Sequence, residues 1–216
     1  YTMSMIEAVK HKYEKSGPKV VEALKKRHFE AFYVSSKEEA VKKAMEIIPQ
    51  GDSIGWGGSF SIDEIGLKAE LEKCGHKMID RDLAKTAEER RKLMVEALCC
   101  DTFLMSSNAI TEDGQLFNID GVANRVAALC FGPKSVVIVA GMNKVVPNLD
   151  AAYHRVRGFS APANAQRFEI NTPCKITGEC ANCMSEDCIC NQFVTTRLCK
   201  PAGRIKVILV SEDLGI

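Results

Sequence analysis

Short apolar runs and longer polar segments with helically spaced apolar positions alternate along most of the chain. The apolar runs predict strands at 29–35, 52–57, 77–80, 102–107, 135–141, 193–198 and 204–212. The polar segments predict helices at 37–48, near 61–74, from 87 to about 99, from about 122, and over 148–168 with a break near Gly158. The run SVVIVAG (135–141) is almost wholly apolar, which is typical of a strand covered on both faces.

This order of elements over 29–158 predicts an α/β fold with a mostly parallel, doubly wound sheet. We expect one domain over residues 1–216. An N-terminal helical extension would occupy residues 1–28, with helices at 3–15 and 18–28 separated at Ser16-Gly17-Pro18. A Cys-rich insertion at 171–191 would precede the last strands.

Local signals refine several boundaries. Capping boxes at Ser36/Glu39 and Thr86/Glu89 predict two helix starts. Asp113-Gly114 predicts a tight hairpin turn with positive φ at both residues. The helix from about 122 is expected to begin at Asp120 as its N-cap and to bury three apolar side chains, Val122, Val126 and Leu129.

Charge and hydropathy exclude several function classes. With 29 basic and 28 acidic residues the net charge is +1, so the sequence predicts no nucleic-acid or anionic-membrane partner. The apolar runs are too short to cross a bilayer. No secretory leader is recognisable, so a chain whose start lies near residue 1 is expected to be cytoplasmic.

The cysteines are unevenly distributed. Six of the ten lie between 174 and 199, and in a reducing compartment such clusters indicate metal, cluster or redox chemistry more often than disulfides. We interpret the four cysteines outside this region as buried small hydrophobes: Cys74, Cys99, Cys100 and Cys130.

Three loops that follow predicted strands carry candidate ligand-binding residues, because ligands of open α/β sheets bind at the carboxyl ends of strands. GWGGSFS (55–61) offers backbone amides to an anion, or is merely a tight turn with a serine N-cap. The loops at 106–125 and 141–146 add amide, carboxylate and basic side chains suited to a small polar or anionic ligand. The candidates are Gly57, Gly58, Ser59, Asn108, Thr111, Glu112, Asp113, Asn118, Asp120, Asn124, Arg125, Asn143 and Lys144.

Several stretches together resemble the LUD (lactate-utilisation) domain family over about residues 5–216: ITEDGQLFNIDGVANRVAAL, SVVIVAGMNKVVPNLDAAYHRVR, NTPCKITGEC and RIKVILVSEDLGI. The resemblance implies a fold similar to ribose-5-phosphate isomerase, glucosamine-6-phosphate deaminase and CoA-transferase. It also implies work beside iron–sulfur partner subunits in organic-acid oxidation, as in bacterial L-lactate oxidation systems. It supplies no catalytic residue, so an activity of the chain alone stays open.

For the Cys-rich segment the resemblance implies the ligand pattern C-x5-C-x2-C-x6-C, met by Cys174, Cys180, Cys183 and Cys190, with Cys188 supernumerary. One Cys-x2-Cys knuckle flanked by single cysteines fits a [4Fe–4S] cluster better than structural zinc, which usually takes two such knuckles. Zinc, or a metal-free segment, remains the alternative.

Two functions follow from these observations. The first is a subunit of an iron–sulfur-dependent organic-acid (L-lactate) oxidation and electron-transfer system. The second is a stand-alone enzyme or binding protein for a sugar-phosphate or CoA-ester ligand, in which the cysteines are only structural. A third possibility is a non-catalytic assembly or regulatory subunit of a lactate-oxidising complex. Fold alone does not decide among the three.

Overall fold

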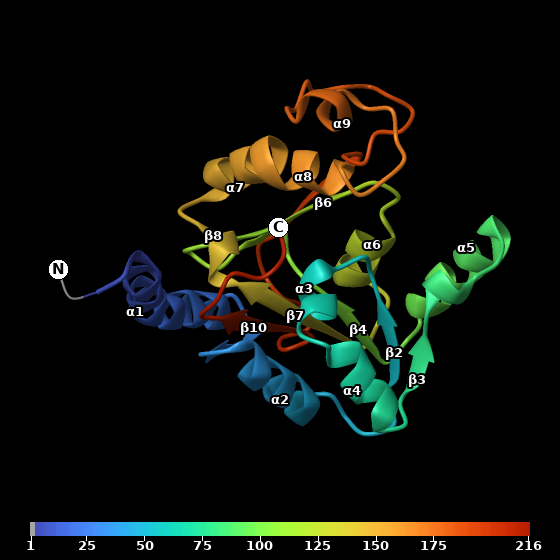
Figure 1. Ribbon diagram of the computed structural model, residues 1–216. Coiled ribbons are helices and arrows are strands. Elements are labelled where there is room, and N and C mark those ends of the chain that lie inside the picture. The colour runs from blue at the N-terminus through green and yellow to red at the C-terminus, as the bar shows by residue number, and fades with distance from the viewer. Residues whose placement is uncertain (1–2) are drawn as a thin grey trace.

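The computed structural model describes residues 3–216, and it contains a six-stranded, wholly parallel sheet at the centre of the α/β fold predicted from the sequence (Figure 1). Residues 1 and 2, the start of the predicted extension, lie outside this range. The strand order is β1 (Glu30–Val34), β10 (Ile205–Val210), β7 (Ser135–Gly141), β4 (Thr102–Met105), β2 (Ser53–Trp56) and β3 (Lys77–Ile79).

Helices cover both faces of this sheet, as the doubly wound prediction requires. On one face lie α1 (Met5–Lys26), α5 (Ala87–Ala97) and α6 (Asn124–Cys130). On the other lie α2 (Lys37–Ile47), α3 (Phe60–Glu64) and α4 (Leu67–Lys73). In β7, Val136 and Ile138 enter the first core and Val137 and Val139 the second, which confirms that this strand is buried on both faces.

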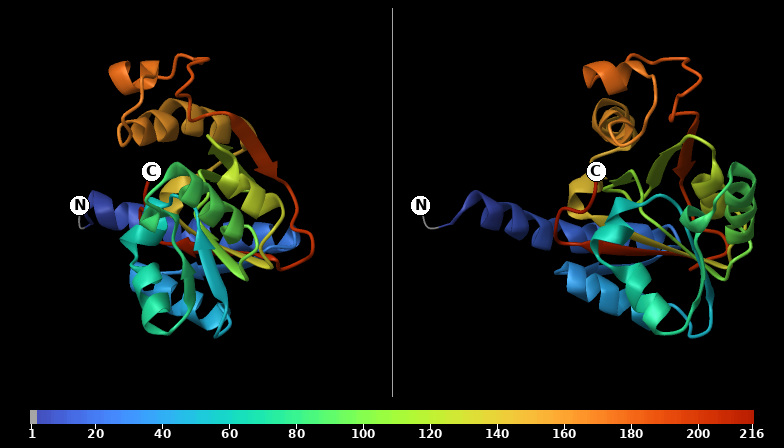
Figure 2. Two further views of the ribbon diagram at one scale, coloured as in Figure 1. Left: turned by 90° about the vertical axis from the view of Figure 1, so that its right-hand side faces the viewer. Right: turned by 45° about the vertical axis from the view of Figure 1, so that its right-hand side comes forward.

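A second, four-stranded sheet stands above the carboxyl ends of the parallel strands (Figure 2). Its order is β8 (Val145–Val146), β5 (Ala109–Thr111), β6 (Leu116–Asp120) and β9 (Gln192–Thr196). Helix α7 (Leu149–Arg155) packs on it through a small apolar core formed with Ala109, Phe117 and Ile119. Beyond α7 the chain forms a π-helical turn (Val156–Ser160) and α8 (Ala161–Ala165). The Cys-rich segment then carries α9 (Pro173–Thr177) and leads into β9.

The predicted break in the N-terminal helix is wrong, because α1 is continuous through Pro18. Proline in a helix interior costs about 3 kcal/mol, but burial of Val20, Val21 and Leu24 against the sheet outweighs that cost. Gly17 permits this packing, since a Cβ there would lie 2.1 Å from the Tyr33 ring.

The helix predicted near 61–74 is also wrong as one element. Gly66 adopts φ 70° and separates α3 from α4. Near Gly158 the predicted break is a widened π-helical turn that joins α7 to α8. The hairpin at Asp113-Gly114 is present between β5 and β6, but only Gly114 has a positive φ, 86°.

The start of α6 differs from the prediction too. Its N-cap is Ala123 with φ 67°, and Asp120 instead accepts a hydrogen bond from the Val126 amide at 3.1 Å, within the first turn. Val122 is exposed, whereas Val126 and Leu129 are buried as expected. Of the four cysteines interpreted as buried, only Cys100 is; Cys74, Cys99 and Cys130 are exposed.

Candidate functional site

A cavity of about 490 Å³ opens at the carboxyl ends of β2, β4 and β7. The chain passes from β2 outward to β3 and then returns to β4 on the other side of β2. This reversal is a topological switch point, the place where open α/β sheets bind ligands. Loop residues after each strand line the cavity: Gly58 and Ser59 follow β2, Ser106 to Asn108 follow β4, and Lys144 follows β7.

The wall of this cavity is rich in positive charge, and we call it the cationic cavity. Its basic residues are Arg81, Arg90, Arg125, Arg167 and Lys144. Among the described residues that line it, Asp120 alone is acidic. Asp120 is already engaged by the Gly121 and Val126 amides and lies 3.7 Å from Arg125. The surplus of basic groups favours an anionic ligand.

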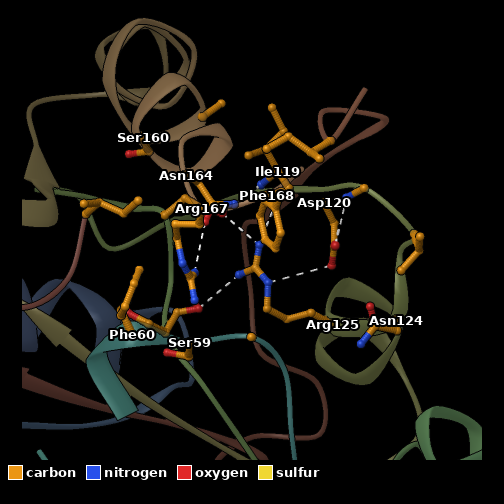
Figure 3. Close-up of a pocket in the computed structure, with 18 of the residues that line it drawn as sticks. Ser59, Phe60, Ile119, Asp120, Asn124, Arg125, Ser160, Asn164, Arg167 and Phe168 are labelled. Carbon is orange, nitrogen blue, oxygen red and sulfur yellow. Dashed lines mark hydrogen bonds and ion pairs between the residues drawn. The ribbon is translucent and has the colours of Figure 1, made fainter. Parts of the chain in front are cut away.

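Arg125 forms the floor of the cavity and is held from every side (Figure 3). Its guanidinium donates to Asn118 Oδ1 at 2.8 Å, to Asn108 Oδ1 at 2.9 Å, and to the carbonyl oxygens of Ser106 and Ile119 at 3.2 and 2.6 Å. Burial lowers its pKa, and nearby Asp120 opposes that shift. A guanidinium with this many protein partners sets the shape and potential of the site rather than clamping a ligand directly.

The two glycines after β2 are needed for the arginines to approach. A Cβ on Gly57 would lie 3.0 Å from Cγ and Cδ of Arg125, and one on Gly58 would lie 3.1 Å from an Arg81 nitrogen. Next to them, Ser59 Oγ is buried and has no hydrogen-bond partner in the part of the chain that the structure describes, so it can bond to a ligand. The glycine loop therefore serves the site through close packing.

Arginines from three further segments complete the wall. Arg81 follows β3, Arg90 lies in α5, and Arg167 follows α8 with its guanidinium 3.6 Å from the centre of the Phe60 ring. Burial and the nearby Arg90 lower the pKa of Arg81, and within residues 3–216 its Nε has no hydrogen-bond partner. Arg90 is already paired with Asp82 at 2.8 Å, whereas Arg81 and Arg167 can offer donors to an anion.

Lys144 is the basic group most withdrawn from solvent, with 4% exposure. Its Nζ donates to Ser61 Oγ at 3.0 Å and to Ser106 Oγ at 3.1 Å. Burial, with smaller contributions from Arg155 and Arg125, lowers the pKa of Lys144 from 10.5 to about 7. Its amine is therefore partly neutral near neutral pH, which is unusual for lysine.

The structure brings many of the predicted ligand residues together. Lining the cationic cavity are Gly58, Ser59, Asn108, Asp120, Asn124, Arg125 and Lys144. Gly57 and Asn118 lie directly behind Arg125. Their role in ligand binding stays a prediction.

Four predicted residues lie elsewhere. Thr111, Glu112 and Asp113 form the β5–β6 turn, where Arg27 of the loop after α1 binds the Asp113 carboxylate. Asn143 holds the C-terminal segment through Leu214 and Gly215. Sequence reasoning missed Arg81, Arg90, Arg167 and Phe168; only Arg81, directly after a predicted strand, carried a signal that could have found it.

A second cavity, of about 340 Å³, lies in the Cys-rich segment, and we call it the thiol cavity. Five cysteines line it: Cys174, Cys180, Cys183, Cys188 and Cys190. Within residues 3–216, no three Cys, His, Asp or Glu side chains converge closely enough to hold one ion. A tetrahedral zinc site needs four donors about 2 Å from one point. The five thiols line one cavity, and cysteine thiolates are ligands for zinc as well as for iron–sulfur clusters.

Arg157 borders the thiol cavity and contacts one of its sulfurs. Its Nε and one terminal nitrogen lie 3.2 and 3.1 Å from Cys180 Sγ. Burial alone would raise the pKa of Cys180, but the Asn182 amide and Arg157 outweigh it, so the pKa is lowered. Burial, then the neighbouring thiols, raise the pKa of Cys190 to about 12. Several thiolates so close together are stable only with a compensating positive charge.

The two cavities share a wall. Ala161, the first residue of α8, and Ile189, between the last two cysteines of the segment, line both of them. Ile189 also packs on Gly121, beside Asp120 of the cationic cavity. A ligand in one cavity would therefore lie next to a group held in the other.

Fold and cavities together describe an α/β protein with a cavity rich in basic residues at its switch point and a thiol-lined cavity beside it. The LUD domain family model matches residues 17–210, and the chain belongs to this family. No curated protein matches the sequence. No helix in residues 3–216 has the length and apolarity to cross a membrane.

Among solved structures, a duf162 family protein from Deinococcus radiodurans is similar in fold, with 14% identity, 91% of this chain and 97% of that chain covered, and a TM-score of 0.53. Ribose 5 phosphate isomerase A from Neisseria gonorrhoeae matches with 18% identity over 61% of this chain and 62% of its own, at a TM-score of 0.33. eIF2B delta from Chaetomium thermophilum matches with 16% identity over 51% of this chain and 48% of its own, at a TM-score of 0.36.

Proposed function

We propose that the protein is a subunit of an iron–sulfur-dependent organic-acid oxidation and electron-transfer system, with L-lactate as the expected acid. In this proposal the cationic cavity binds the carboxylate and the thiol cavity holds a [4Fe–4S] cluster. The observation that carries the proposal is the wall that the two cavities share at Ala161 and Ile189, so that the cavity with basic side chains adjoins the cavity with five thiols. Membership of the LUD domain family supports it.

The chain's own residues would have separate tasks. Arg81 and Arg167 have guanidinium groups on the cavity wall that can bind a carboxylate, and Ser59 Oγ can bond to a neighbouring oxygen. The donors of Arg125 are already hydrogen-bonded within the protein, so this residue would keep the electrostatic potential of the cavity positive without moving. Cys174, Cys180, Cys183 and Cys190 would be the cluster ligands, and Cys188 lies at the same cavity. Such a cluster supplies one-electron transfer.

The proposed function is tested by L-lactate oxidation in extracts of cells that contain the chain together with its native partner subunits. A strain without the chain would be complemented with the wild type, with Cys180→Ser/Cys183→Ser, or with Cys99→Ser. We expect lactate-dependent dye reduction to be lost in the double variant. Cys99 is exposed and lies outside the thiol cavity, so its variant should behave as wild type and is the matched control.

Two outcomes would contradict the proposal. One is undiminished lactate oxidation in the strain that lacks the chain. The other is wild-type oxidation by the double cysteine variant, which would remove the thiol cavity from the electron path.

A second candidate function is favoured by the number of basic groups. Five basic residues line a cavity of about 490 Å³, more space than a monocarboxylate needs, and even with Arg125 saturated and Lys144 partly neutral the remaining guanidinium groups suit a sugar phosphate or CoA ester. Calorimetry with ribose 5-phosphate, acetyl-CoA, L-lactate and pyruvate would separate the two candidates. Binding of the phosphorylated compounds alone, abolished by Gly58→Val, would favour the second function, with the cysteines as a structural metal site or metal-free segment.

A further inference from the structure

Lys144 has an arrangement of partners that a salt-bridge lysine lacks. Its side chain reaches the cationic cavity from the short 3₁₀ turn Met142–Lys144, directly after β7. Within residues 3–216, two serine hydroxyls are the hydrogen-bond partners of Nζ, and Glu64, the carboxylate whose charge acts on Lys144, forms its ion pair with Lys37 instead. Ion pairing therefore does not explain why this amine is buried.

The two hydroxyls match the neutral form of the amine. A neutral amine has two N–H bonds and one lone pair, whereas an ammonium has three N–H bonds. Ser61 Oγ and Ser106 Oγ accept both N–H bonds of the neutral form and leave its lone pair available. The pKa of about 7, lowered mainly by burial, is consistent with this form.

We infer that Lys144 is a nucleophilic amine that forms an imine with the carbonyl group of a small 2-oxo acid bound in the cationic cavity. The carboxylate of such a ligand is matched by the arginines of the wall, and its carbonyl carbon by the amine. Desolvated lysines in pockets that carry other cationic groups are the usual imine-forming lysines. A 2-hydroxy acid such as L-lactate would bind without reacting, because it has no ketone carbonyl for the amine to attack.

The reaction is balanced without any further reagent. The lone pair of Nζ attacks the carbonyl carbon, and the carbonyl oxygen takes up a proton to give a carbinolamine. Loss of the hydroxyl group as water then forms the C=N bond, so amine plus ketone gives imine plus water. Ser61 and Ser106 can each donate and accept a proton at Nζ during these transfers.

The test is reductive trapping of the full-length, reduced protein with pyruvate and sodium borohydride at neutral pH. We expect one reduced pyruvate per chain by intact mass, mapped to Lys144 by peptide mass spectrometry. An amine with a pKa near 7 contains on the order of 10³ times more neutral form at that pH than an ordinary lysine. The adduct should therefore be confined to one of many lysines.

Lys144→Arg keeps the positive charge and should abolish trapping. Lys206→Arg is the matched control: Lys206 is also poorly exposed, but it is paired with Glu30 in the sheet and lies outside both cavities, so trapping should be unchanged. Peptide mapping of the adduct uses the wild-type protein, so this part of the test does not depend on whether a variant folds. A wild type that is not trapped, or an adduct spread over several lysines, would overturn the inference.

The inference shares the cationic cavity with the proposed function but does not use the thiol cavity. Lactate oxidation that depends on Cys180 and Cys183, in a protein that pyruvate does not modify, would leave the proposed function standing and remove the imine. Trapping at Lys144 in a chain without cluster or oxidation activity would do the reverse.

Discussion

Burial of Lys144 should make the stability of the protein depend on pH in a defined direction. At about pH 6 the lysine carries a proton in both the folded and the unfolded state, so folding bears the whole cost of burying the ammonium group. Above pH 7 the folded protein releases this proton, while the unfolded chain keeps it up to about pH 10.5. The contribution of this residue to the free energy of unfolding therefore increases as the pH rises from about 7 to about 10.5.

The magnitude follows from the two pKa values. A shift from 10.5 to about 7 corresponds to a cost of about 5 kcal/mol at low pH. Near pH 9 the folded protein has released the proton and the unfolded chain still binds it, so the cost falls to about 2 kcal/mol. Lys144→Met removes the charge and keeps the length of the side chain. The stability advantage of the variant over the wild type should therefore be largest near pH 6. It should shrink by about 2 to 3 kcal/mol between about pH 6 and pH 9.

Urea unfolding of reduced, metal-free wild type and Lys144→Met at several pH values measures this difference. Other titrating groups are common to both proteins and cancel in the comparison. A difference between the two proteins that stays constant within about 0.5 kcal/mol over this range would refute the reasoning. The amine would then be solvated, and the imine inference would lose its support.

Two further variants test how the cationic cavity is built. Gly57→Val should lower stability by about 1 to 3 kcal/mol, because the new side chain overlaps Arg125; unchanged thermal unfolding and anion affinity would contradict this. Arg125→Gln removes the guanidinium donor from the Ile119 carbonyl and from the side-chain oxygens of Asn108 and Asn118, which keep one backbone N–H donor each, so a loss of about 3 kcal/mol is expected in urea unfolding. A loss below about 1 kcal/mol would mean that this network is not needed for folding.

Periodicity alone predicts the central sheet, because each strand carries its own signal. The nearly all-apolar run of β7 is an example, because consecutive apolar residues predict burial on both faces of a strand. Helix α1 shows the limit of local signals. Gly17-Pro18 predicts a break, but the glycine is there for contact with Tyr33, and tertiary packing carries the helix through the proline.

The candidate site could be predicted only where its residues follow a strand in one recognisable loop. Asn108, Asp120 and Arg125 lie in one stretch, 106–125, which contains the β5–β6 hairpin and the start of α6, and they were accessible in this way. Arg90 and Arg167 are helical and post-helical residues far apart in the chain, and only the path of the chain brings them to one cavity. The shared wall at Ala161 and Ile189 has no sequence signature, since both residues look like ordinary apolar positions.

The proposed function requires that the thiol cavity holds an iron–sulfur cluster beside an anion site. Its most direct test is anaerobic purification of the full chain, followed by visible spectroscopy and analysis of iron, acid-labile sulfide and zinc, with Cys180→Ser/Cys183→Ser and Cys99→Ser in parallel. We expect broad thiolate-to-iron absorption with iron and sulfide in equal amounts, lost in the double variant and kept in Cys99→Ser. Colourless wild-type protein with one zinc per chain, or a double variant that keeps its iron, would contradict the claim.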